Sequence, residues 1–240
     1  MQQAYQALRV ISEAQTVHLV LGIRHGELIL TELCAACEAL QARSSDGIKA
    51  VILDFADPAA TQNEDQPEMS ELLARALAAV RGIPQPVLAV ARASLSASAS
   101  SFLAEADFTL IAHEAEIYWP ALDGNNAQKG SEQRIGGVVA TRLGYATWSA
   151  PAADLQREME RVLDMLRTKS ALALRHAKAS TRLSLSTSAP ATLAAQTAKS
   201  QLEALRQINQ FYLTNVTATQ DAQEGLQAFL EKRPPRWQNR

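Results

Sequence analysis

The sequence predicts an α/β core followed by an all-helical C-terminal region, and two patterns in the chain support this prediction. Before residue 150, short apolar runs typical of buried strands alternate with segments of helical period. Such alternation favours a parallel sheet covered by helices. After that point, apolar residues recur only at helical spacing. We therefore expect an α/β core at residues 1–149 and a helical region at residues 150–240.

The core contains four expected strands, each rich in β-branched residues or leucine. They span residues 16–23, 48–55, 84–91 and 107–119. Helices are expected between the strands, at residues 28–43 and 70–83. Another helix begins within the stretch SLSASASSFLAEAD at residues 94–107, which has many small residues and no glycine. A turn from a strand to a helix often binds a ligand, and it usually carries glycine so that the backbone can approach that ligand.

The C-terminal region contains three expected helical segments. They cover residues 152–180, 191–216 and 221–233. The apolar residues of the first segment recur three or four positions apart, which places them on one side of a helix.

The composition excludes several classes of function. Of the 240 residues, 47% are hydrophobic, so the chain can form a sizeable core. With a formal net charge of −2, it lacks the concentrated basic surface that nucleic acids need. No apolar run reaches the length of a membrane span, and the first residues lack the pattern of a signal peptide. These features predict a cytoplasmic protein without a nucleic-acid or membrane partner.

The two cysteines, Cys34 and Cys37, have the spacing of a redox motif or of half a zinc site. They also fall within the helical pattern formed by Leu30, Leu33 and Leu40, where cysteine acts as a small apolar residue. The chain has no second cysteine pair and no histidine pair at ligand spacing. We therefore expect both thiols in the core and no metal site.

The end of the chain carries its most specific motif, DAQEGLQAFLEKRPPRW at residues 221–237. This motif resembles the C-terminal signature of the crotonase (enoyl-CoA hydratase/isomerase) superfamily, in which E-G-x-x-A-F-x-E-K-R-x-P is followed by x and an aromatic residue. Residues 83–120 are similar to the family segment that begins KPVIAAVNG and ends in a proline-glutamate pair. The stretches GIKAVILDF at residues 47–55 and GGVVATRLG at residues 136–144 also resemble family motifs in the same order.

The resemblance implies a crotonase-like spiral of ββα units with a C-terminal helical region that forms trimers or pairs of trimers. It also implies an acyl-CoA thioester as the ligand and no separate cofactor. In this family, two backbone N–H groups hold the thioester oxygen while negative charge develops on it. In the hydratases of the family, two glutamates handle the water molecule and the α-proton.

Carried over by position, the family's functional residues are mostly replaced in this chain. Ser98 matches the middle glycine of the family triplet and would supply one backbone N–H to the oxyanion hole. Arg92 and Ala93 stand where the family has asparagine and glycine. The two glutamate positions fall on Ser101 and Ala121, neither of which can act as a carboxylate base. Hydration by the two-carboxylate mechanism is therefore not expected.

Five further residues are candidates for a role in binding or catalysis. Asp123 and His25 could act as relocated catalytic groups, or they could be loop residues without such a role. Trp119 would stand near the acyl pocket and could fill it. Lys232 and Arg233 match basic tail positions that lie near CoA phosphates in relatives, or they form a solvated helix end.

Two functions follow as expectations. In the first, the protein has lost hydratase chemistry and serves as a non-catalytic or weakly acyl-binding subunit. It would form a homotrimer or hexamer, or assemble beside a second crotonase-family subunit. In the alternative, it is an active enzyme that hydrates, isomerises, hydrolyses or decarboxylates an acyl-CoA or acyl-carrier thioester with relocated catalytic residues.

Overall fold

The computed structural model describes residues 5–13, 15–21, 26–42, 47–56, 67–120, 132–186 and 194–239. Within these residues, the main sheet has the strand order β1-β2-β3-β4-β5-β8. Its strands are β1 (Leu8–Glu13), β2 (Thr16–Leu21), β3 (Ala50–Phe55), β4 (Val87–Ala91), β5 (Phe108–Ala112) and β8 (Trp148–Ala150). Only the pairing of β1 with β2 is antiparallel, and the strands from β2 to β8 run parallel. The carboxyl ends of these parallel strands therefore lie at one edge of the sheet.

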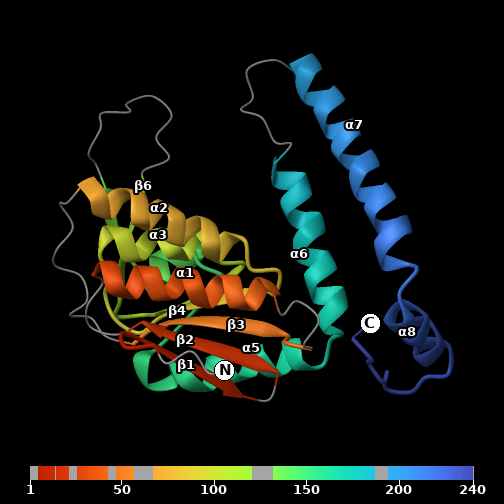
Figure 1. Ribbon diagram of the computed structural model, residues 1–240, viewed down its shortest axis with the longest axis horizontal. Helices are drawn as coiled ribbons and strands as arrows, with labels where there is room; N and C mark the ends of the chain where they lie inside the picture. The colour runs from red at the N-terminus through yellow and green to blue at the C-terminus, as the bar shows by residue number, and fades with distance from the viewer. Residues whose placement is uncertain are drawn as a thin grey trace.

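Helices cover both faces of this sheet (Figure 1). On one face lie α1 (Glu27–Ala42), α2 (Pro67–Arg81) and α3 (Ala97–Glu105). On the other face lies α5 (Leu155–Arg167), which follows the short 3-10 turn η2 (Ala152–Asp154). The mixed α/β fold with a parallel sheet is thus confirmed, and residues as far apart as Leu19, Leu88 and Leu163 are fully buried in its core.

A second, two-stranded sheet leaves the main one after β5. It pairs β6 (Glu116–Pro120) antiparallel with β7 (Glu132–Gly136), and α4 (Gly137–Arg142) follows directly. Gly137 has no room for a side chain, because a Cβ there would overlap the carbonyl oxygen of Ala112. The glycine lets the start of α4 lie against the end of β5.

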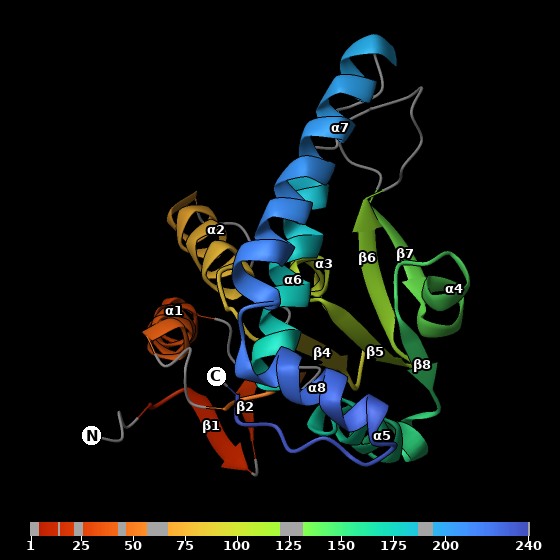
Figure 2. The same cartoon turned by 90° about the vertical axis from the view of Figure 1, so that its right-hand side faces the viewer.

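The C-terminal helices project from the α/β part of the molecule (Figures 1 and 2). They are α6 (Ala171–Ser186), α7 (Ala194–Phe211), the π-helical turn η3 (Tyr212–Val216) and α8 (Gln220–Leu230). Helices α6 and α7 pack side by side, and α8 lies beside the base of α6. In the described part of the chain, no helix is long and apolar enough to cross a membrane.

The elements agree with the sequence expectations in most places and differ in three. The expected strand at 107–119 is two strands, β5 and β6, because a turn at His113 and Glu114 separates them. The expected helix at 152–180 is divided into α5 and α6 near Ser170, whose hydroxyl caps the start of α6 by accepting the N–H of Ala173 at 3.1 Å. Strands β1, β7 and β8 were not expected.

The two cysteines lie where the sequence predicted. Cys34 and Cys37 are free thiols, and both are buried in the face of α1 that packs on the sheet. Burial raises the pKa of the Cys37 thiol to about 12. Among the described residues, no group of histidine, cysteine and carboxylate side chains could hold a metal ion.

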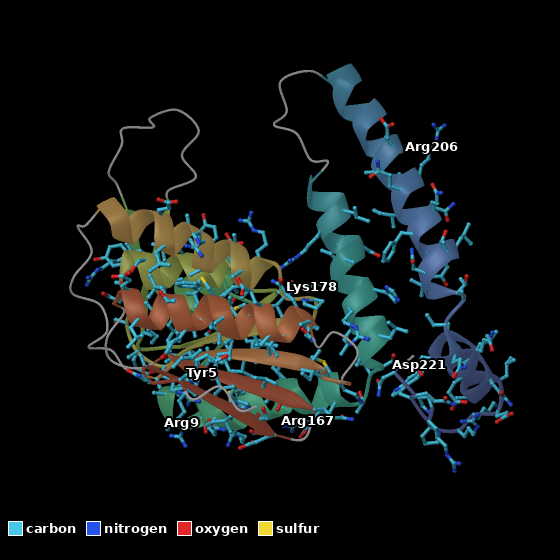
Figure 3. All side chains as sticks on the ribbon, viewed as in Figure 1. Tyr5, Arg9, Arg167, Lys178, Arg206 and Asp221 are labelled. Carbon is cyan, nitrogen blue, oxygen red and sulfur yellow. The ribbon has the colours of Figure 1, made fainter. Side chains whose placement is uncertain are left out.

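A buried ion pair attaches α6 to the sheet. The Asp107 carboxylate accepts the backbone N–H of Val87 at 2.8 Å and lies 2.6 Å from the Lys178 ammonium. Lys178 also donates to the carbonyl oxygen of Gln85 at 2.8 Å, and its side chain points toward the α/β part of the molecule (Figure 3). Burial lowers the pKa of Lys178 to about 8 even though Asp107 acts to raise it. The charged ammonium therefore depends on the carboxylate opposite.

We predict that Asp107→Ala lowers the free energy of unfolding by about 3 kcal/mol, because it leaves Lys178 buried without its carboxylate and Val87 N–H without an acceptor. Urea-induced unfolding followed by circular dichroism measures this change. Asp164→Ala is the matched control, since Asp164 is 71% exposed and pairs with Arg167 on the same helix. The control should lose less than about 0.5 kcal/mol. Equal losses in the two variants would contradict the structural role of Asp107.

Candidate functional site

The turn between β4 and α3 is held by serine hydroxyls instead of being shaped by glycine. Ser96 is the N-cap of α3, and its hydroxyl accepts the N–H of Ala99 at 3.2 Å. The carbonyl oxygen of Ser96 accepts the N–H of Ser100 at 2.9 Å. The helix expected in the serine-rich stretch therefore begins at Ala97, directly beyond the carboxyl end of β4.

The same stretch is bonded to β6, which lies alongside it. The hydroxyl of Ser94 accepts the N–H of Glu116 at 3.0 Å, and the N–H of Leu95 donates to the Glu116 carbonyl oxygen at 2.9 Å. One turn into the helix, the buried hydroxyl of Ser100 accepts the N–H of Tyr118 at 3.0 Å. Ser94, Leu95 and Ser100 thus form hydrogen bonds with the backbone of β6. These bonds fix the position of α3 relative to β6.

Ser98 lies in the first turn of α3. Its hydroxyl is 3.2 Å from the hydroxyl of Ser96. The N–H groups of a first helical turn point toward the N-terminal end of the helix and carry partial positive charge there. The first turn of α3, which contains Ser98, therefore carries partial positive charge at its N-terminal end. A role for Ser98 as an oxyanion donor stays a prediction.

Ser101 stands at the first expected glutamate position. Its hydroxyl donates to the carbonyl oxygen of Ala97 at 3.1 Å, within the same helix. The second glutamate position, Ala121, lies outside the described residues, as do the candidates His25 and Asp123. The loop that would supply a second oxyanion donor follows β3, and its residues 57–66 are also outside the described part.

Trp119 belongs to β6, where its backbone is in register with Gln133 of β7. This register puts the residue on the short hairpin that is bonded to the serine stretch. A role for Trp119 in filling an acyl pocket stays a prediction.

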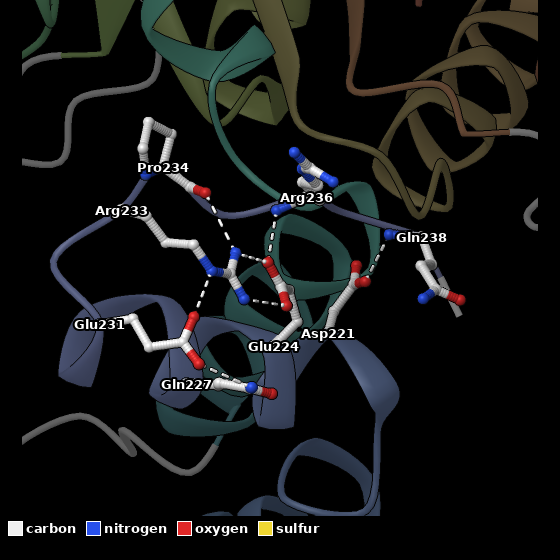
Figure 4. A network of polar contacts seen from close by, with 8 residues as sticks. All are labelled: Asp221, Glu224, Gln227, Glu231, Arg233, Pro234, Arg236 and Gln238. Atoms are coloured by element: carbon white, nitrogen blue, oxygen red, sulfur yellow. Dashed lines mark hydrogen bonds and ion pairs between the residues drawn. The ribbon is translucent and has the colours of Figure 1, made fainter.

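The two basic candidates of the tail follow α8. Lys232 is exposed and has a left-handed backbone with φ of 53°, which ends the helix. The Arg233 guanidinium is held between two carboxylates (Figure 4): it bonds Glu224 at 2.6 and 3.0 Å and Glu231 at 2.5 Å. These hydrogen bonds raise the pKa of Arg233, and they lower the pKa of Glu224 to about 2. Arg233 thus has a structural role, and contact with CoA stays a prediction for both residues.

The rest of the C-terminal motif folds back on α8. The contacts it makes there account for the glutamate, glycine and tryptophan of the motif. Glu224 also accepts the backbone N–H of Arg236 at 2.7 Å, and the indole N–H of Trp237 donates to the Thr168 carbonyl oxygen at 2.8 Å. The Trp237 ring lies so close to Gly225 that a Cβ there would be 3.3 Å from it. The motif is therefore a docked tail in which glutamate, glycine, arginine and tryptophan contact one another.

Sequence analysis missed the carboxylates that organise this tail. Asp221 is buried and accepts the backbone N–H groups of Gln238 at 2.7 Å and of Asn239 at 3.0 Å, together with the hydroxyl of Ser170. The signal that could have found Asp221 and Glu224 is their spacing of three residues on one helix, followed by a run of arginines.

We predict that Glu224→Gln releases residues 232–239 at neutral pH, because it removes the charge that binds Arg233 and weakens the acceptor for Arg236 N–H. Hydrogen exchange of the Arg236 amide, measured by mass spectrometry, should accelerate. Since the pKa of Glu224 falls from 4.5 to about 2 on folding, the contact stabilises the wild type fully above pH 4.5 and is lost as the pH falls through about 2. Glu231→Gln is the control and should keep Arg236 protected. Slow exchange in Glu224→Gln would contradict this assignment.

Comparisons with known proteins agree with this fold. The family model described as enoyl-CoA hydratase/isomerase matches residues 30–240. An enoyl-CoA hydratase/isomerase from Mycobacterium paratuberculosis aligns with a TM-score of 0.78 and 18% identity, covering 99% of this chain and 100% of that one. An enoyl-CoA hydratase from Bacillus anthracis aligns with a TM-score of 0.75 and 19% identity, covering 98% and 100%.

A third structure, an enoyl-CoA hydratase from Polaromonas sp. JS666, aligns with a TM-score of 0.73 and 21% identity, covering 97% of this chain and 100% of that one. No curated protein sequence matches the chain. At these identities the solved structures establish the shared fold, and the family model covers most of the chain. The chain belongs to the enoyl-CoA hydratase/isomerase family, also called the crotonase superfamily.

Proposed function

We propose that this protein binds an acyl thioester, such as an acyl-CoA, at the N-terminal end of α3 without hydrating it. The observation that carries the proposal is the position of α3, whose first turn begins at the carboxyl edge of the parallel sheet. Ligands of such sheets bind at this edge, where helix N-termini offer N–H groups. Membership of the enoyl-CoA hydratase/isomerase family supports a thioester as the ligand.

The thioester carbonyl oxygen would accept a hydrogen bond from the backbone N–H of Ser98. The partial positive charge at the start of α3 favours an oxygen on which negative charge develops. The hydrogen bonds that Ser94 and Ser100 accept from the backbone of β6 hold this first turn in place before a ligand arrives. The donor is therefore preorganised, which reduces the entropic cost of binding.

Loss of hydratase chemistry is part of the proposal. The two-carboxylate mechanism of the family needs a base and an acid, and the matching positions hold Ser101 and Ala121. A serine hydroxyl that donates to Ala97 within its own helix is a poor replacement for a glutamate. We therefore infer a non-catalytic or weakly acyl-binding subunit.

The exposed apolar face of the C-terminal helices supports a proposal that this subunit self-associates. On α8, Leu226, Phe229 and Leu230 form one stripe and are 62%, 79% and 71% exposed. On α7 and on η3, further apolar side chains are exposed, namely Leu205, Tyr212 and Leu213. Exposed apolar side chains gathered on one helix face are typical of protein interfaces. We propose that it binds a second copy of this chain in a trimer or hexamer, or an equivalent subunit of the same family.

We predict that acetoacetyl-CoA binds saturably, with a Kd on the order of micromolar, and that crotonyl-CoA is not hydrated. Isothermal titration calorimetry and the loss of enoyl absorbance measure the two quantities. Ser98→Gly should tighten binding by about tenfold, because it removes a Cβ and a hydroxyl from space that the thioester needs. Ser101→Gly is the control. It lowers the helix propensity of α3 by a similar amount, but at a position beyond the first turn, and it should leave the Kd for acetoacetyl-CoA unchanged.

Absence of binding at millimolar acetoacetyl-CoA would contradict the acyl-binding proposal. Hydration that disappears in Asp123→Asn or His25→Ala would contradict the non-catalytic one and support an enzyme with relocated catalytic residues. Binding that responds equally to Ser98→Gly and Ser101→Gly would place the ligand elsewhere.

We predict that Phe229→Asp converts the oligomer into monomers, because it places a charge in the centre of the apolar stripe. Size-exclusion chromatography with light scattering measures the mass directly. Leu143→Asp is the control, since Leu143 is also apolar and 56% exposed but lies at the C-cap of α4. The control should keep the mass of the wild type. A wild type that is monomeric at tens of micromolar would contradict the proposed assembly.

A further inference from the structure

A side-chain bridge at the carboxyl edge of the sheet is not explained by the thioester site alone. The Arg92 guanidinium bonds the Asp54 carboxylate through two nitrogens, with N–O distances of 2.9, 2.9 and 3.2 Å. The same guanidinium donates to the side-chain oxygen of Gln156 at 2.9 Å. Arg92 therefore joins three elements, because Asp54 is on β3, Gln156 is on α5, and Arg92 directly follows β4.

The carboxylate of the bridge is largely buried, and the guanidinium is partly exposed. The Asp54 side chain is 9% exposed and the Arg92 side chain 30% exposed. A two-nitrogen contact between a guanidinium and a carboxylate fixes both the distance and the orientation of the partners. A lysine could supply the charge but not this fork of donors. The pair therefore holds the ends of β3 and β4 in one relative position.

The end of β3 is fixed from both faces of the sheet. Asp54 bonds Arg92, and the same Arg92 guanidinium donates to Gln156 on α5. The next residue, Phe55, points to the opposite face and packs on Phe102 of α3, with ring centroids 6.3 Å apart. A shift of the β3 end would therefore move α3 as well as the strand.

The bridge lies next to the turn that leads into the proposed thioester site. Arg92 is the first residue after β4, and the turn that leads into α3 starts with it. Asp54 precedes by two residues the point where the chain leaves the sheet after β3. The turn into α3, to which the family resemblance assigns one oxyanion donor, therefore begins at this bridge.

We propose that Arg92 and Asp54 are a positioning pair that fixes the first turn of α3 for the thioester carbonyl oxygen. This inference rests on the proposed acyl-binding function and adds a residue pair to it. Neither side chain is required to touch the ligand. The pair acts by holding the strand end and the turn from which the Ser98 N–H is presented.

The test is the preference of the protein for acetoacetyl-CoA over CoA, measured as the ratio of the two Kd values by calorimetry. This ratio isolates the contact with the acyl group, because both ligands share the nucleotide. Arg92→Met should lower the ratio about tenfold, and Arg92→Lys should lower it less, because lysine keeps the charge without the fork. A general loss of protein stability would weaken the binding of both ligands by the same factor and leave the ratio of their Kd values unchanged.

Two further variants keep the test decisive. Arg92→Met leaves the Asp54 carboxylate buried without its partner, so the double variant Asp54→Asn with Arg92→Met removes that charge and should show the same lowered ratio. Arg81→Met is the control, because Arg81 also makes a two-nitrogen contact with a carboxylate, at 2.5 and 2.6 Å, with Glu105 at the far end of α3. The control should keep the wild-type ratio.

The outcomes separate this inference from the proposed function. A wild type that binds acetoacetyl-CoA no better than CoA overturns both. A wild type with a clear preference that the Arg92 variants retain overturns the positioning role alone. An equal loss of preference in Arg81→Met also overturns it, because any loosening of α3 would then suffice.

Discussion

The hydrogen bonds between the serine-rich stretch and β6 are the constraint on which the candidate site depends. They hold the turn after β4 and the first turn of α3 against a strand that belongs to a different sheet. Without glycine, the turn has no special backbone freedom, so its shape must come from such side-chain bonds. Ser94 and Ser100, which flank the position of the family glycine triplet, thus hold the helix start that a thioester would meet.

The residues that maintain the fold are different from those at the family's catalytic positions. The Asp107–Lys178 attachment of α6 and the docked tail around Glu224 are held by paired charges and hydrogen bonds that maintain the fold. The positions at which relatives would carry catalytic glutamates hold a serine and an alanine. The proposal of a binding subunit rests on this combination of a maintained family fold and an altered set of functional residues.

Much of the fold could be predicted because its signals are local. Continuous apolar runs identified β2, β3 and β4, and helical period identified α1 and α2. The division of β5 from β6 could not be predicted, because buried Ala115 and Ile117 continue the apolar pattern across the turn. The break between α5 and α6 was hidden for a similar reason: the Thr168–Ser170 junction contains neither glycine nor proline. At the site, the start of α3 was predictable, but the serine partners lie on β6, 18 and 22 residues away.

The most direct measurement of the central claim is the vibrational frequency of the thioester carbonyl in the bound state. Acetoacetyl-CoA labelled with carbon-13 at the thioester carbon would be added to the wild-type protein, and the infrared difference spectrum recorded. A hydrogen bond from the first turn of α3 predicts a shift of the carbonyl band to lower frequency than in water, because the donor polarises the bond. A band that stays at its solution frequency while the ligand is fully bound would contradict the account.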